Sequence, residues 1–272
     1  MTKPGHGAAA VFAVIALALT LAGCSSGGSV EPIAQSPSET PTTTAASPFT
    51  TKGDDGQVKV VEKGLSATRK GAEELLSFGL VLENTNRKAV AFPKYAINLL
   101  DAAGKRLYEG EYDIDPPLSA PRILPGGRYG VGVTSSHPNP AKVADIRVVI
   151  IETEWVTSND REQFAKLTAG PVRTERATAS QRAAAETTSV TFTIDSAFSK
   201  PLLAVEMSAI FRNTARKIVG GARHLKRQDG MNSIHIPPGR STHEMALEDD
   251  TPSSADDSRT EVYVFPFVFP PS

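Results

Sequence analysis

The chain reads LSFGLVLENTNRK over residues 76–88, and this stretch decides the fold class. Large apolar residues occupy every second position from Leu76 to Leu82. Successive side chains of a β-strand point to opposite faces, so this alternation predicts a strand with one buried face. The Asn-Thr pair that begins at Asn84 predicts a turn at the end of that strand.

A second copy of this pattern lies in the C-terminal half of the chain. Apolar residues alternate over 205–211, and Asn213 then begins the run NTARK, which resembles the NTNRK that begins at Asn84. Further along, LPGGR at 124–128 is matched by IPPGR at 236–240. Because the two matches occur in the same order and follow predicted strands, they indicate an internal duplication.

The two copies differ in spacing. Arg128 follows Asn84 by 44 residues, whereas Arg240 follows Asn213 by 27. We therefore expect an insertion in the first copy, in the proline-containing segment 108–122.

Further short strands are predicted around these anchors. The segment DAAGK at 101–105 predicts a hairpin turn in which Gly104 takes the left-handed backbone conformation. Short strands separated by turns at these intervals are typical of an antiparallel sandwich, so the predicted fold class is all-β. The additional predicted strands are 58–62, 95–99, 129–133, 145–154 and 190–195.

The stretch YAINLLDAAGK at 95–105 resembles the FxLYD-type domain, with an Asn-Thr turn before it and a Pro-Gly turn after it. LLD at 99–101 stands where that family has Leu-Tyr-Asp. The resemblance covers about 58–155 and, in a weaker form, 190–269. That family is an immunoglobulin-like β-sandwich of bacterial surface lipoproteins. The resemblance therefore implies two tandem immunoglobulin-like antiparallel β-sandwiches, with no catalytic residues.

Cys24 is the only cysteine, and it follows an apolar N-terminal segment. That segment has the layout of a secretory signal. An uncleaved anchor is the competing interpretation, but the run has about 14 apolar residues where a spanning helix needs about 20. The sequence LAGC at 21–24 resembles the lipobox of bacterial lipoproteins. The resemblance implies cleavage before Cys24, lipid on its thiol, and anchoring at the extracytoplasmic face of the bacterial cell membrane.

Composition divides the chain into segments. The stretch 25–56 is rich in Ser, Thr, Pro and Gly and has few large apolar side chains, which is typical of a flexible linker. A capping-box pattern at Asn159 and Glu162 predicts a short helix between the two copies. The predicted organisation is a signal peptide (1–23), a lipidated flexible linker (24–56), a first sandwich (57–157), a short helix and linker (158–189) and a second sandwich (190–272).

Charge and motifs exclude several classes of function. The formal net charge of −1 over 272 residues argues against a nucleic-acid partner and against electrostatic membrane binding. There is no Gly-x-Ser-x-Gly motif, and aromatic residues make up only 6% of the chain. The sequence therefore predicts a protein that is not an enzyme and has no cofactor.

Histidines and acidic residues offer weak candidates for metal binding. His235 and His243 flank a Pro-Pro-Gly turn and could hold a metal if His224 joined them. The acidic segment 109–115 could supply oxygen ligands to Ca²⁺. A solvated strand pair and a solvated loop are the simpler interpretations, so no metal site is predicted.

The C-terminal segment VYVFPFVF at 262–269 is apolar on both faces. A strand buried in the second core would explain it. Pro266 cannot donate to a central ladder, so an edge strand is expected, and an edge with an apolar outer face is also a docking surface. The predicted partner-binding residues are Tyr263, Phe265, Phe267 and Phe269.

These features predict a lipid-anchored extracytoplasmic protein that binds or scaffolds an envelope protein partner. The alternative is a small-ligand or metal-binding lipoprotein associated with a transporter. A deep polar pocket between the domains would favour the alternative, whereas a bare apolar edge at 265–269 would favour the scaffold.

Overall fold

A computed structural model describes residues 49–70, 73–108, 117–157, 165–178, 180–181, 187–227, 235–247 and 251–266. In these segments the elements are thirteen β-strands and two short 3-10 helices, η1 (Pro140–Lys142) and η2 (Asp257–Arg259). The predicted all-β class is confirmed. None of the described helices has the length and apolar character that a membrane crossing requires.

The first sandwich consists of two antiparallel sheets. One has the strand order β1-β7-β4-β5 and the other has the order β2-β3-β6. The strands are β1 (Phe49–Lys52), β2 (Val58–Lys70), β3 (Glu73–Asn84), β4 (Val90–Leu100), β5 (Leu118–Ser119), β6 (Arg128–Ser136) and β7 (Asp145–Val156).

The second sandwich also consists of two antiparallel sheets, with the orders β11-β10-β13 and β12-β9-β8. Its strands are β8 (Leu167–Glu175), β9 (Thr188–Ser196), β10 (Ala204–Arg212), β11 (Ile218–Arg227), β12 (Gly239–Leu247) and β13 (Glu261–Pro266).

The two sandwiches share one topology. We count β2 as the first strand of the first sandwich and β8 as the first strand of the second. In each sandwich the first, second and fifth strands then form one sheet, and the fourth, third and sixth strands form the other. β1 stands outside this count, and it pairs with β7, the sixth strand of the first sandwich. The two halves of the chain therefore share one architecture.

The sequence alignment of the two copies is offset by one strand in its first half. Asn84 ends the second strand of its copy, whereas Asn213 follows the third strand of the other copy. The topological equivalent of Asn84 is Ser196 at the end of β9. Arg128 follows Asn84 by the same number of residues as Arg240 follows Ser196. The expected insertion in the first copy is therefore wrong, because it was measured between residues that are not equivalent. The match between LPGGR at 124–128 and IPPGR at 236–240 does align equivalent positions, just before β6 and β12.

Each sandwich has its own apolar core, and the predicted alternation supplies it. The side chains of Leu76, Phe78, Leu80 and Leu82 lie in the first core, around the buried Trp155. The second core contains Val190, Phe192, Val205, Met207 and Phe211. The predicted turn at Gly104 is present, with φ of 76° and a hydrogen bond from its N–H to the carbonyl of Asp101.

Two strands lie where linker was predicted. β1 falls inside the predicted 24–56 linker, and it pairs with β7 because Phe49 stacks on Trp155. β8 falls inside the predicted 158–189 linker, and its apolar side chains pack on the second core. A register shift at Gly170-Pro171 interrupts the alternation of β8, which conceals the strand in the sequence. Most of the expected helix, 158–164, lies outside the described residues.

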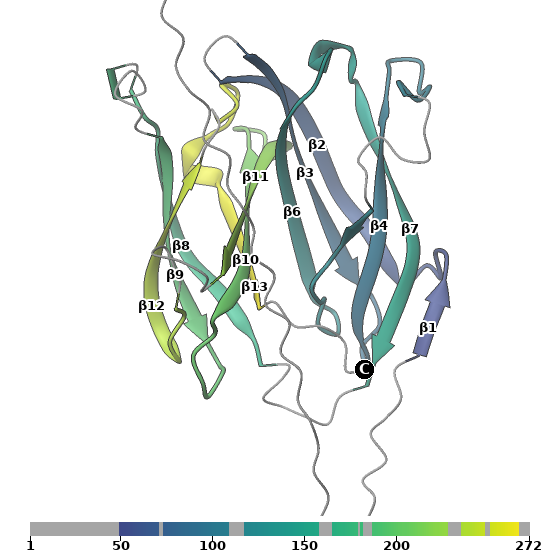
Figure 1. Cartoon of the computed structure of the whole chain (residues 1–272), viewed down its shortest axis with the longest axis vertical. Coiled ribbons are helices and arrows are strands. Elements are labelled where there is room, and N and C mark those ends of the chain that lie inside the picture. The colour runs from purple at the N-terminus through teal and green to yellow at the C-terminus, as the bar shows by residue number, and fades with distance from the viewer. Residues whose placement is uncertain are drawn as a thin grey trace, which may run out of the picture. The chain divides into compact units, whose positions relative to one another are not determined.

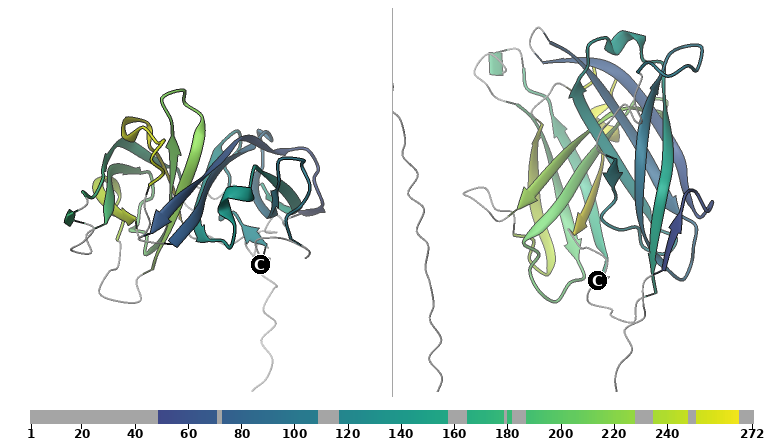
Figure 2. Two further views of the ribbon diagram at one scale, coloured as in Figure 1. Left: turned by 90° about the horizontal axis from the view of Figure 1, so that it is seen from above. Right: turned by 45° about the vertical axis from the view of Figure 1, so that its right-hand side comes forward.

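Sheet β2-β3-β6 of the first sandwich packs face to face on sheet β11-β10-β13 of the second, so the folded unit has four layers (Figure 1). Figure 2 shows the same four layers from above and from the side. The residues from Thr44 onward form one compact unit. As a consequence β3 and β10, in the two middle layers, are buried on both faces over most of their length.

Candidate functional site at the contact between the sandwiches

The contact between the two sandwiches is lined by glycine on both sides. A Cβ atom built on Gly79 would lie 2.7 Å from the carbonyl oxygen of Gly220. One built on Gly132 would overlap the backbone of Ala209 and Ala222. Sheets that pack through ordinary side chains stay about 10 Å apart. The absence of side chains at these positions therefore lets the two backbones approach more closely.

The strands of the two sheets cross each other. Along β11, Ile218 lies against β2, Gly220 lies against β3, and Ala222 lies against β6. A strand aligned with the strands of the facing sheet would contact a single one of them along its whole length. The steps from β2 to β6 show that β11 crosses all three strands of the facing sheet, as the opposite tilts of the ribbons in Figure 2 illustrate.

Hydroxyl side chains bind the backbone across this contact. The Ser77 hydroxyl accepts from the N–H of Gly221 at 3.1 Å, and Thr134 donates to the carbonyl of the same residue at 2.8 Å. Ser66 donates to the carbonyl of Val219 at 2.5 Å. Buried polar groups are stable only when they are hydrogen-bonded, so these bonds require the two sheets to stay in register.

A carboxylate is buried at one side of the contact. Glu206 of β10 is 1% exposed, and it accepts hydrogen bonds from the hydroxyl of Tyr129 at 2.6 Å and from Arg223 at 2.8 Å. Tyr129 belongs to the first sandwich, whereas both other residues belong to the second. Burial, and then the neighbouring Tyr95 and Glu206, raise the pKa of Tyr129 well above its usual value.

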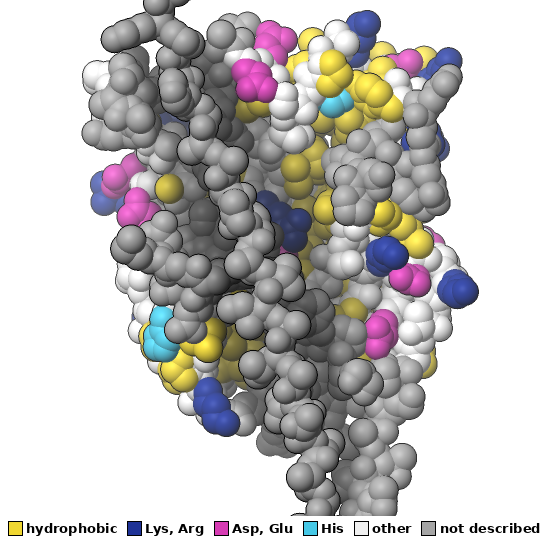
Figure 3. All heavy atoms as spheres, viewed as in Figure 1, with side chains coloured by type: hydrophobic (Ala, Val, Ile, Leu, Met, Phe, Trp, Pro, Cys, Tyr) yellow, Lys and Arg dark blue, Asp and Glu magenta, His cyan; other side chains and the backbone are white. Residues whose placement is uncertain are grey.

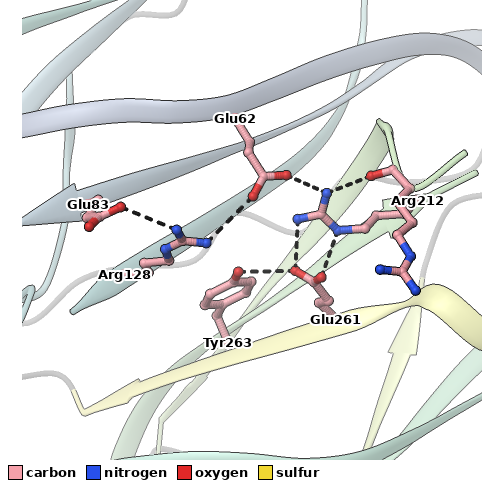
Figure 4. Close-up of polar contacts among 7 residues, drawn as sticks. Glu62, Glu83, Arg128, Arg212, Glu261 and Tyr263 are labelled. Atoms are coloured by element: carbon pink, nitrogen blue, oxygen red, sulfur yellow. Dashed lines mark hydrogen bonds and ion pairs between the residues drawn. The ribbon is translucent and has the colours of Figure 1, made fainter. Parts of the chain in front are cut away.

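An ion-pair network extends along the same contact (Figure 4). The guanidinium of Arg212 on β10 donates to Glu261 at 2.7 Å and to Glu62 of the first sandwich at 2.5 Å. Arg128 lies 3.7 Å from Glu62 and 3.4 Å from Glu83. Because the side chain of Arg212 is only 9% exposed, its two carboxylate partners keep it charged between the sheets.

A buried arginine joins the two sandwiches near the start of β8. Arg122 of the first sandwich is 2% exposed and donates to the carbonyl of Ala165 at 2.6 Å. Its guanidinium lies 5.4 Å from the ring centre of Phe198 in the second sandwich. Burial lowers the pKa of Arg122 to about 10.

Two of the predicted partner-binding residues lie in the contact between the sandwiches. The ring of Phe265 is 4.5 Å from the ring of Tyr129, and the ring of Tyr263 lies over Gly130. Both side chains are half-buried, and the opposite face of β13 lies in the second core. The outer face of β13 is therefore covered by the first sandwich along these residues. β13 is also the last strand of its sheet within the described segments, as expected of an edge.

The other predicted site residues lie outside the described residues. These are Phe267 and Phe269 of the partner-binding set and Cys24, the predicted lipidation site. The acidic segment 109–115 is also outside the described residues.

The described part of the chain holds no cluster of three or more His, Cys, Asp or Glu side chains that could bind a metal. His243 bonds the hydroxyl of Ser241 at 2.6 Å, and His235 is exposed. On the face drawn in Figure 3, Lys and Arg side chains lie beside Asp and Glu side chains, so the visible described residues mix the two charges.

Sequence reasoning missed the residues that join the sandwiches, although a signal was present. Gly130 and Gly132 alternate with the apolar residues of their strand, and Gly220 and Gly221 interrupt another. Glycine weakens a strand, so its presence there often marks a site where another backbone approaches closely.

A scan against protein-family models and a search of the curated proteins found no match for the chain. The resemblance to the FxLYD-type domain stays a prediction.

Proposed function

We propose that the protein is a lipid-anchored extracytoplasmic scaffold whose two sandwiches act as one rigid body that binds an envelope protein. The observation that carries this proposal is the glycine-lined contact between the sheets. A jointed pair of domains would lose freedom of movement on binding, whereas a pre-organised pair does not. The close backbone contact and its hydroxyl bonds favour presentation of a fixed surface.

The proposed partner site is the end of β13 and the residues that follow it. Tyr263 and Phe265 contact the first sandwich, so they are less available to a second protein than an isolated edge strand would make them. Phe267 and Phe269 continue the apolar pattern beyond Pro266. We therefore assign partner contact to Phe267 and Phe269, with the edge of β13 beside them.

Crosslinking in cells tests the proposal. The lipidated protein would be crosslinked in its native envelope, and the captured proteins identified by mass spectrometry. We expect one dominant envelope partner, which a variant with Phe267→Ser and Phe269→Ser fails to capture. The matched control is Val61→Ser with Val149→Ser, which removes two apolar side chains that are 38% and 36% exposed elsewhere on the surface.

The outcomes separate the proposal from its alternative. Loss of the partner in the first variant alone, with unchanged thermal unfolding, supports the scaffold. Equal capture by both variants would remove the assignment of Phe267 and Phe269. The absence of any specific partner would overturn the scaffold and would direct the work to ligand screening by thermal shift.

The anchor is tested separately by Cys24→Ala. Without the thiol no thioether to lipid can form, so we expect an unprocessed or released protein. Fractionation into a detergent phase and the mass of the N-terminus measure this. A variant that still has a trimmed N-terminus and still partitions into detergent would contradict lipidation at Cys24.

A further inference from the structure

The N-terminal part of the chain enters the folded unit at one end of the first sandwich. β1 begins at Phe49, which pairs with Trp155, and Trp155 in turn pairs with Ala91 at the start of β4. The turn that contains Arg87 and Lys88 lies just before β4, so both residues lie at this same end. In Figure 1 β1 starts at the lower end of the picture.

The second sandwich contributes to the same end. Ile123 pairs with Ala91, and the neighbouring Arg122 contacts Phe198 in the connection from β9 to β10. That connection also carries Lys200 and Leu203. The end where the chain enters is thus formed by turns of both sandwiches.

This end is more basic than the chain as a whole. Arg87, Lys88 and Lys200 are exposed there, as is Lys166, whose carbonyl accepts from the N–H of Ala197 in the same connection. The exposed acidic residues beside them are Asp54 and Asp55, with Asp55 bound to the indole N–H of Trp155, and Asp195, which pairs with Arg240. Among the described exposed residues of this end, four basic side chains therefore lie beside two carboxylates, Asp54 and Asp55, for which no ion pair is seen, and the half-buried Glu154 of β7 adds a third carboxylate.

The same end carries two of the most exposed large apolar side chains. Leu203 is 50% exposed and Phe49 is 46% exposed. Single exposed apolar residues are normal on protein surfaces, but here they accompany a local excess of positive charge. Basic residues beside exposed apolar side chains are the combination that binds the interface of an anionic bilayer.

We propose that this end of the folded unit rests on the anionic surface of the membrane that anchors the protein. The proposal builds on the proposed lipid anchor. The predicted linker covers residues 24–56, and the part of it that precedes β1 would reach roughly 27 Å as a flexible coil. Such a tether holds the end at an effective concentration on the order of millimolar, so a weak attraction is enough for contact. Contact would fix the orientation of the unit and would hold the end of β13 near the membrane surface, because Pro266 pairs with Val205 close to Leu203.

Vesicle binding of the non-acylated mature chain tests the proposal. The chain from residue 24 onward, with Cys24→Ser, would be sedimented with vesicles of phosphatidylcholine alone or with vesicles in which one lipid in three is phosphatidylglycerol. We expect preferential binding to the anionic vesicles that falls as salt rises. Because this chain carries no lipid, the result does not depend on whether Cys24 is acylated in cells.

Charge reversals locate the binding end. Arg87→Glu with Lys88→Glu should weaken binding to anionic vesicles by roughly 30-fold or more, since each basic residue near such a surface contributes about 1 kcal/mol. Lys166→Glu with Lys200→Glu should weaken it to a similar extent. The matched control is Lys105→Glu with Lys142→Glu, two exposed residues at the opposite end of the first sandwich, which changes the net charge equally.

The variants would first be checked for unchanged thermal unfolding. Loss of binding in the first two variants and not in the control supports the proposal. Equal loss in all three would show that only net charge matters, and it would overturn the assignment to this end. Equal binding to neutral vesicles, or no binding by the parent chain, would overturn the proposal outright, and cell fractionation of the Cys24→Ala variant would still decide the anchor independently.

Discussion

Sheet β2-β3-β6 of the first sandwich and sheet β8-β9-β12 of the second have the same place in the same topology, yet only one is covered. The outer face of the first carries Gly79, Gly130 and Gly132 and is buried under the second sandwich. The outer face of the second carries threonine and charged side chains, such as Thr193 and Glu244. Its counterpart of Gly132, counted from the equivalent Arg128 and Arg240, is Glu244.

The fold alone therefore does not specify the docking of the two sandwiches. Both sheets present the same backbone geometry, so the difference lies in the side chains of the outer face. Glycine permits a close backbone approach, whereas threonine and charged residues keep water on the surface.

The largest effect is expected for Gly132→Ala. The added Cβ would overlap the backbone of Ala209 and Ala222, which cannot move without disturbing β10 and β11. We expect a loss of roughly 3 kcal/mol or more in the free energy of unfolding, at the upper end of overpacking effects. In calorimetry we expect one unfolding transition for the parent chain and two for the variant, because the sandwiches would then unfold separately.

The control for this prediction is Thr242→Ala on the exposed face of β12. It should change stability by no more than about 0.5 kcal/mol, as is usual for surface substitutions. Equal effects of the two substitutions would refute the claim that glycine lining distinguishes the two sheets.

A somewhat smaller effect is expected for Glu206→Ala. The substitution leaves the hydroxyl of Tyr129 and the guanidinium of Arg223 without their buried acceptor. Removing one partner of a buried pair costs about 3–5 kcal/mol, and partial exposure of Arg223 reduces this to about 2–3 kcal/mol. Urea denaturation measures the loss.

The matched control is Asp195→Ala, which breaks an exposed pair with Arg240 in the second sandwich. Its cost should stay at about 0.5 kcal/mol or less. A similar loss from both substitutions would mean that the contact between the sandwiches gives Glu206 no special role.

The two asparagines of the sequence repeat should differ in importance. Asn84 is fully buried, and its side-chain amide donates to the carbonyls of Ala89 at 2.9 Å and Ile123 at 3.0 Å. The side chain of Asn213 accepts a hydrogen bond from the N–H of Lys217 at 3.0 Å in an exposed turn. Thermal unfolding should show a loss of about 2 kcal/mol for Asn84→Ala and about 0.5–1 kcal/mol for Asn213→Ala. Equal losses would support the alignment of Asn84 with Asn213, which the strand topology contradicts.

The smallest effect at moderate pH is expected from the buried tyrosines. Burial raises the pKa of Tyr95 and Tyr129 above the usual value of about 10, so the folded chain retains protons that the unfolded chain releases. The tyrosines should therefore cost no stability below about pH 9, about 0.4 kcal/mol each at pH 10, and about 1.4 kcal/mol each per pH unit well above pH 10.

Urea midpoints measured against pH, together with tyrosinate absorbance, check this prediction. The buried residues of the second core include no tyrosine, so the loss should be confined to the first sandwich and the contact. Tyr129→Phe should reduce the alkaline loss. A folded chain whose tyrosines all ionise near pH 10 would contradict the burial of Tyr95 and Tyr129.

Much of the fold could be predicted from the sequence because it depends on alternation. The run from Leu76 to Leu82 sets one face of β3 against the first core, as predicted. β8 could not be predicted in the same way, because the bulge at Gly170-Pro171 breaks the period of its apolar residues. The repeat was misaligned because a five-residue turn motif can recur at the end of a strand that is not equivalent.

The contact between the sandwiches was not predicted, and the reason lies in the residues that form it. A docking face made of apolar side chains leaves a hydrophobic pattern in the sequence. Here the face is made of glycine and of hydroxyl groups such as those of Ser77 and Thr134, which sequence patterns associate with turns and solvent. The burial of Tyr263 and Phe265 against the other sandwich depends on tertiary packing, which no local pattern of β13 records.

The polar outer face of β8-β9-β12 has a consequence for self-association. The two sandwiches are joined through unlike sheets, so the same contact repeated between molecules would add units head to tail into an open filament. Such growth would require the outer sheet of the second sandwich to accept another chain as β2-β3-β6 accepts β11-β10-β13. Charged residues such as Glu244 stand where that contact needs glycine. The polar outer face of β8-β9-β12 therefore disfavours the docking of a further sandwich.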